Sequence, residues 1–119
     1  MSKSIKLKNN VYWSSQIYDY TNKEVGVWYD GKKLYRKLIP ITLPNGIQTT
    51  YPTGLSNVHV VGIEGYASYN NTTIPINYYN CIYVGSATHC YYDNGTLYLG
   101  CTFNGSNYNG HVILYFTYN

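Results

Sequence analysis

No part of this sequence repeats apolar residues at the spacing of an amphipathic helix. Instead, β-branched and aromatic residues form short stretches that Asn, Gly and Pro interrupt about every eight to twelve positions. This spacing is typical of short antiparallel strands in a sandwich or a barrel. We therefore expect an all-β protein, an antiparallel β-sandwich with jelly-roll-like connections.

The chain has 119 residues, enough to build one hydrophobic core. We expect one β-sandwich domain over residues 11–119 and a basic N-terminal lead-in over residues 1–10. Leu43–Ile47 and the stretch that continues to Gly54 are predicted to be loop. The expected strands are Ile5–Lys8, Glu24–Tyr29, Lys33–Ile39, Val58–Tyr69, Ile76–Tyr79, Ile82–Val84, Thr88–Tyr92, Thr96–Phe103 and His111–Tyr118.

The composition favours a surface of neutral polar groups and phenol rings, since charged residues are only 11% and Tyr occupies 17 positions. The net charge of +3 comes without a long basic run, so we do not expect a nucleic-acid partner. No apolar stretch is long enough to cross a bilayer, and no signal-peptide core follows the first residues. We expect no membrane insertion, and synthesis in a cytosol.

The three cysteines, Cys81, Cys90 and Cys101, are an odd number, which argues against a disulfide framework. We expect them to be reduced and mostly buried. His89 and Cys90 are adjacent, so they point to opposite faces of a strand, and no Cys-x-x-Cys is present. No metal or other cofactor is therefore expected.

The first of two predicted hairpins turns at Asp30-Gly31. A two-residue turn there places Val27 and Leu34 on the core face. A bulged turn at the same dipeptide would shift this register, and the sequence alone leaves both open. With the two-residue turn, the other face carries Trp28 over Lys33, Tyr35 over Gly26, and Glu24 beside Lys37.

The second hairpin turns at Asn94-Gly95, and its alternation separates a buried face from a polar one. The buried face carries Tyr92, Leu97, Cys90, Leu99, Thr88 and Cys101. On the opposite face, Tyr91, Asp93 and Tyr98 are the candidate ligand-binding residues, with Thr96 and His89 beside them. The alternative is that these tyrosines only pack within the sandwich or between subunits, because Tyr is enriched at interfaces of any kind.

The last strand, His111–Tyr118, is apolar on both faces. Val112, Leu114 and Phe116 alternate with Ile113, Tyr115 and Thr117. A strand of this kind is covered on both sides. Because a small isolated sandwich covers only one, we expect a homo-oligomer.

The first hairpin also carries a family pattern, formed by Val25, Gly26, Trp28, Asp30, Gly31, Lys32, Leu34, Tyr35, Arg36 and Lys37. It resembles the C-terminal β domain of tail-fibre and minor structural proteins of bacteriophages and prophages. Further matches follow at 58–67, 74–79 and 112–118. Two positions depart from the pattern. Val27 stands where the family commonly has a Thr before the Trp, and the ending Tyr-Phe-Thr-Tyr-Asn lacks the Lys that usually follows the Tyr-Thr of the final strand.

The resemblance implies a structural role for the motif residues. Asp30 and Gly31 make the turn, Trp28 and Tyr35 pack, and Arg36 hydrogen-bonds a neighbouring backbone group or carboxylate. It further implies a virion protein, commonly a homotrimer, with other virion proteins as partners.

These observations predict a receptor-binding virion protein that attaches to the bacterial surface through a saccharide. Rings stack on sugar faces while amides and carboxylates bind hydroxyls. One alternative is a capsid- or tail-associated assembly protein without an external ligand. Another is a free-standing carbohydrate-binding module, which would be a monomer.

Enzymatic function is not expected. A glycosidase needs two carboxyl groups at a controlled separation. Asp30 is assigned to a turn and Glu24 to a strand, and no motif joins the other acidic residues, Asp19, Glu64 and Asp93. A Cys-His nucleophile pair likewise lacks an orienting third group in the sequence.

Overall fold

The short strands assemble into two antiparallel sheets that pack face to face, which confirms the predicted all-β sandwich. The computed structural model describes residues 22–80 and 86–119. The lead-in at 1–10 and the expected strands Ile5–Lys8 and Ile82–Val84 lie outside these residues. The described strands are β1 (Lys23–Val27), β2 (Lys33–Thr42), β3 (Gln48–Pro52), β4 (Val58–Tyr69), β5 (Thr72–Pro75), β6 (Tyr78–Asn80), β7 (Ser86–Asp93), β8 (Thr96–Cys101) and β9 (Asn109–Tyr118).

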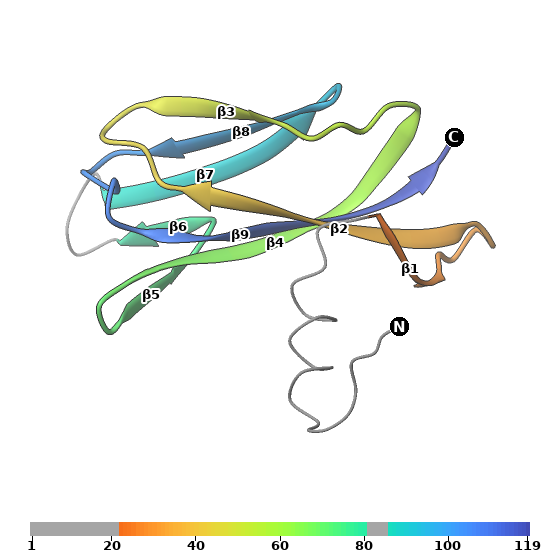
Figure 1. Cartoon of the computed structure of the whole chain (residues 1–119), viewed down its shortest axis with the longest axis horizontal. Helices are drawn as coiled ribbons and strands as arrows, with labels where there is room; N and C mark the ends of the chain where they lie inside the picture. Colours follow the sequence, from red (N-terminus) through yellow and green to blue (C-terminus); the bar gives the residue numbers. More distant parts are fainter. Residues whose placement is uncertain (1–21, 81–85) are drawn as a thin grey trace, which may run out of the picture.

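The strand order explains the jelly-roll-like character. The five-stranded sheet has the order β1-β2-β9-β4-β5 and the four-stranded sheet the order β3-β8-β7-β6. In Figure 1, β3, β8 and β7 lie above β2, β9 and β4. β2 pairs with β9 in one sheet, and their chain neighbours β3 and β8 pair in the other. Two paired segments therefore pass together between the sheets, as in a jelly roll.

The last strand lies in the middle of the larger sheet. Val112, Leu114 and Phe116 of β9 have no exposed surface, and they meet the inner residues of both flanking strands. Ile113 and Tyr115, on the opposite face, are half-buried. The predicted alternation is confirmed, because each successive side chain of a strand points to the other face.

The hairpin at Asn94-Gly95 forms with the predicted register. Asn94 and Gly95 both have positive φ, 46° and 90°, as a two-residue hairpin turn requires. The pairs run from Asp93 and Thr96 at the tip to Thr88 and Cys101. Five of the six residues predicted for the buried face are buried, and Tyr92 is half-buried.

The hairpin at Asp30-Gly31 takes the bulged alternative. Gly31 has a φ of 87°, Gly31 N donates to Trp28 O at 2.9 Å, and Trp28 N donates to Lys32 O at 2.8 Å. Val27 therefore lies opposite Lys33 instead of Leu34. The prediction that Val27 marks the core face is wrong, because its side chain is 67% exposed.

The shifted register also changes the partners of two other residues. Glu24 lies 3.8 Å from Lys33, whereas it was expected beside Lys37. Tyr35 does not cover Gly26; its ring packs on Phe116 at 5.8 Å, inside the sandwich. Its predicted role as a packing residue holds, with a different neighbour.

The prediction of a loop up to Gly54 is wrong, because β3 lies within it. Gln48–Pro52 pairs with β8 and forms an edge of the smaller sheet. An edge strand alternates half-buried and exposed residues and tolerates Pro52 at its end, so its apolar signal is weak. The four-residue strand β5, also at an edge, was missed, and β6 begins at Tyr78 where a strand was expected from Ile76.

Gly110 tests how closely β9 and β4 approach each other. A Cβ built on Gly110 would lie 1.9 Å from the backbone oxygen of Tyr66, whereas one on Gly26 meets nothing within 4 Å. We predict that Gly110→Ala lowers the free energy of unfolding by about 1 to 3 kcal/mol or more. The control Gly26→Ala should change it by less than about 0.5 kcal/mol. Urea denaturation at one protein concentration measures both, and equal midpoints for the two variants would contradict the register.

Candidate functional site

The three predicted binding residues lie together on the outer face of the smaller sheet. Tyr91 of β7 and Tyr98 of β8 are directly opposite each other, and their rings stack with centroids 4.7 Å apart and planes 9° apart. Tyr91 remains 45% exposed despite this contact. Asp93 is exposed and lies two residues further along β7 on the same face. We call this the tyrosine platform, formed by Tyr91, Asp93 and Tyr98.

His89 extends the platform at its other end. Its ring lies over Gly100, where an added Cβ would be 2.0 Å from the ring. The Nε2 atom lies 3.0 Å from Oε1 of Gln48 on β3. Only a glycine leaves room for the ring to lie flat here, so Gly100 and Gln48 hold His89 in place.

Hydrogen-bonding groups of β3 border the rings. Thr50 is paired with Tyr98 and Pro52 with Thr96, on the outer side. Sequence reasoning missed Gln48 and Thr50 because it placed them in a loop. Their Thr-rich alternation, Gln48-Thr-Thr-Tyr-Pro52, was the available signal for a strand.

The platform combines apolar and hydrogen-bonding groups that are open to a ligand. The side chains of Tyr91, Tyr98 and Asp93 make no hydrogen bond to another residue in the described part of the chain. Because the two rings face each other, each offers its outer face and its edge as apolar surface, and the hydroxyls and the carboxylate offer hydrogen bonds beside it. Both kinds of group are carried by paired strands, which fix the backbone beneath them.

The buried thiols below the platform are not poised for reaction. Cys90 and Cys101 are free and buried. Burial raises the pKa of Cys90 to about 11 and also raises the pKa of Cys101. Both therefore stay protonated near neutral pH, whereas nucleophiles and metal ligands are thiolates. Among the described residues no group of three or more His, Cys, Asp or Glu side chains gathers at one place.

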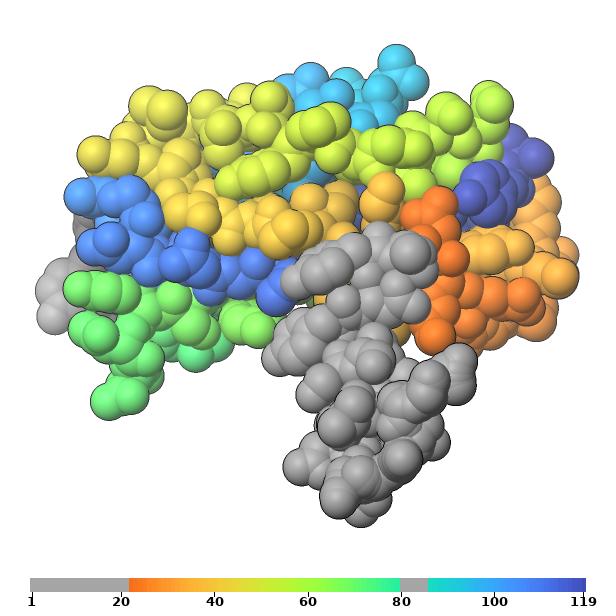
Figure 2. Space-filling view, in the orientation of Figure 1, coloured from red at the N-terminus to blue at the C-terminus, as the bar shows by residue number. Residues whose placement is uncertain are grey.

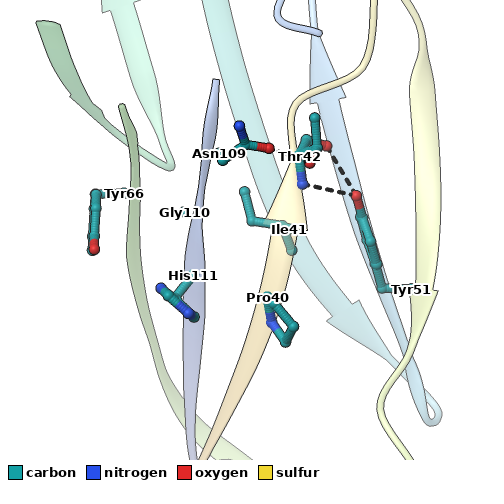
Figure 3. Close-up of a pocket in the computed structure, with 8 residues that line it drawn as sticks. All are labelled: Pro40, Ile41, Thr42, Tyr51, Tyr66, Asn109, Gly110 and His111. Carbon is teal, nitrogen blue, oxygen red and sulfur yellow. Dashed lines mark hydrogen bonds between the residues drawn. The ribbon is translucent and has the colours of Figure 1, made fainter. Parts of the chain in front are cut away.

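A hollow of about 430 Å³ lies on the larger sheet, away from the tyrosine platform, and is a second candidate site. Figure 3 shows Pro40, His111 and Tyr66 on three neighbouring strands beside it. The Tyr51 hydroxyl closes one end, because it accepts from Thr42 N at 3.0 Å and donates to Thr42 O at 2.9 Å. Most polar groups that line this hollow hydrogen-bond to other residues of the chain, which makes the hollow a weaker candidate than the tyrosine platform.

Tyr115 and Glu64 form a further polar pair on the outer face of this sheet. The Tyr115 hydroxyl donates to Oε1 of Glu64 at 3.2 Å, and Arg36 lies opposite Tyr115 on β2. Burial and then the charge and hydrogen bond of Glu64 raise the pKa of Tyr115, while Arg36 acts in the opposite direction. The pair therefore stabilises the neutral phenol.

Comparison with known proteins identifies no relative: no protein-family model, no curated protein and no solved structure matches the chain significantly. The described residues contain no helix long and apolar enough to cross a membrane.

The Tyr115 pair yields a prediction about pH. Glu64→Gln should lower the pKa of Tyr115, because it removes the negative charge and leaves burial unchanged. The contribution of the neutral phenol to stability is present at neutral pH and is lost as the pH rises through the raised pKa. NMR titration of ¹³Cζ-labelled tyrosines, with Tyr115→Phe to assign the signal, measures the change. Glu24→Gln is the control, and a Tyr115 pKa equal in both variants would contradict the contact.

Proposed function

We propose that this protein is a bacteriophage virion component of the tail-fibre or receptor-binding type, which attaches to a saccharide of the bacterial surface through the tyrosine platform. The observation that carries this proposal is the stacked pair Tyr91–Tyr98, exposed on a flat strand face. The family pattern around Asp30 and Gly31 supports the virion assignment.

The geometry of the pair favours a flat, hydroxyl-rich ligand. The two rings are nearly parallel, at 9°, so each has one face against its neighbour and one face open to a ligand, and Asp93 and Thr96 lie at the end of the same sheet face. A pyranose ring presents C–H groups to an aromatic face and hydroxyls at its rim, which matches this arrangement. Because Tyr91 and Tyr98 stack on each other across the β7–β8 ladder, their rings are already ordered and lose less conformational entropy on binding.

The oligomeric part of the proposal is a homotrimer. The family resemblance implies the trimer, and the outer face of β9 supports only a partner subunit, because Ile113 and Tyr115 are half-buried in the single chain. A second copy that packs against this face would bury these apolar groups. The larger sheet would then serve assembly, and the smaller sheet would face the host.

Binding is tested by replacing both rings of the platform. Tyr91→Ala with Tyr98→Ala should weaken binding to host cells or to a glycan array at least about tenfold, since each ring contributes stacking of about 1 kcal/mol. Tyr29→Ala is the control, because Tyr29 is 90% exposed at the hairpin of the other sheet. Unchanged binding by the folded double variant would refute the assignment, and a wild-type protein that never binds cells alone would favour the assembly role.

The oligomer is tested by light scattering on a size-exclusion column. We predict a mass near three times the chain mass of 13.6 kDa. The mass of a monomer would contradict the proposed trimer and would favour the free-standing carbohydrate-binding module.

A further inference from the structure

A polar groove lies beside the tyrosine platform, at the end of the sandwich where the β7–β8 hairpin turns. It consists of two adjoining hollows of about 550 and 530 Å³, which share Val58, Tyr92 and Asn94 as lining residues. The first is also lined by His59, Asp93 and residues 60–63 of β4, three of which are aliphatic. The second is also lined by Ser56, Asn57 and Asn119. Each hollow is within the size range of small-molecule sites. We call this feature the tip groove.

Hydrogen bonds to backbone carbonyl oxygens hold the walls of the tip groove. The backbone nitrogen and the Oγ1 of Thr53 both donate to the carbonyl oxygen of Gly95, at 3.1 and 2.7 Å. Thr53 is only 2% exposed, so this anchor is inside the protein. On the facing wall, Asn119 N donates to Asn57 O at 2.9 Å. Figure 2 shows the chain between β3 and β4, in yellow-green, beside the blue hairpin tip.

Because none of these hydrogen bonds uses an asparagine amide, the asparagine side chains of the groove keep their hydrogen-bonding capacity. Within the part of the chain that the structure describes, the side chains of Asn57, Asn94 and Asn119 have no hydrogen-bond partner. Two other asparagines use theirs within the chain. Asn77 accepts from Cys90 N at 2.9 Å, and Asn109 accepts from Thr42 Oγ1 at 2.6 Å.

The remaining groups of the groove suit hydroxyls better than a metal ion. Amides offer both donors and acceptors, as vicinal hydroxyls require. Asp93 is the one carboxylate side chain that lines either hollow, whereas calcium sites gather six to eight oxygen ligands and several charges. Tyr92 adds a half-buried ring on the groove wall. The chemistry is that of a neutral, hydroxyl-rich ligand.

Asp93 joins the tip groove to the tyrosine platform, since it belongs to the platform face and also lines the groove. We propose that the tip groove binds the sugar unit next to the one stacked on Tyr91 and Tyr98, so that the protein recognises an oligosaccharide and not a single sugar. This inference rests on the proposed saccharide-binding function.

The asparagines allow a test with a matched control. Asn57 and Asn94 have positive φ, 56° and 46°, which glycine adopts without strain, so Asn57→Gly with Asn94→Gly removes the amides and keeps the backbone. Asn70 also has positive φ, 53°, but lines neither hollow, so Asn70→Gly is the control. Asn119→Ala, outside every strand, is a separate variant that does not disturb a turn. Thermal unfolding checks that each variant is folded.

Binding is measured on an array of bacterial capsular and O-antigen oligosaccharides graded in length from single sugars upward, and confirmed by titration of the best-bound oligosaccharide. We expect wild type and Asn70→Gly to bind longer oligosaccharides more tightly than single sugars. The double glycine variant should bind the longer ones about ten- to thirtyfold more weakly and single sugars equally well, because it loses two or more hydrogen bonds. Asn119→Ala should weaken the longer ones about three- to fivefold.

Two results would overturn the inference in distinguishable ways. If the asparagine variants bind longer oligosaccharides as wild type does, while Tyr91→Ala with Tyr98→Ala loses binding, the groove is not a subsite and the proposed function stands. If the wild-type protein binds no oligosaccharide of any length, the inference and the saccharide-binding function both fail.

Discussion

The rest of the structure depends on the burial of β9 between β2 and β4. Its inner side chains, Val112, Leu114 and Phe116, have no exposed surface, and each such burial stabilises the fold by roughly 1.5 to 3 kcal/mol. β8 precedes β9 in the chain and lies between β3 and β7 in the other sheet, with Leu97 and Leu99 equally buried. These two consecutive strands therefore supply the middle of both sheets and hold the two halves of the core together.

The central strands also determine which side chains reach the surface. Since Leu97, Leu99 and Cys90 point inward, the pleat directs Tyr91 and Tyr98 outward on the same paired strands. The backbone beneath the tyrosine platform is therefore fixed by the same strands that form the core. The tip groove is positioned in the same way, because the hairpin that carries Asn94 is anchored to the buried Thr53.

Sequence reasoning succeeded where the local signal and the packing agree. The bounds of β4 were predicted to the residue, and the Asn94-Gly95 turn set the register that brought Tyr91 onto Tyr98. It failed at sheet edges. β3 was expected as loop because an edge strand buries few side chains, and Val27 was assigned to the core because Asp-Gly permits two turn types with different registers. Because this edge strand was not predicted, Gln48 and its contact with His89 were not predicted either.

The sequence by itself determined the all-β class, the inward and outward faces of β7, β8 and β9, and the composition of the tyrosine platform. These follow from the two-residue period of a strand and from the turn chemistry of Asn-Gly, which act over a few neighbouring residues. Only the tertiary structure decided that β3 pairs with β8, that Gln48 holds His89, and that Thr53 fixes Gly95 and so shapes the tip groove. The Gln48–His89 and Thr53–Gly95 contacts join residues 41 and 42 positions apart in the sequence. They depend on which strands become neighbours within the smaller sheet, which no local pattern specifies.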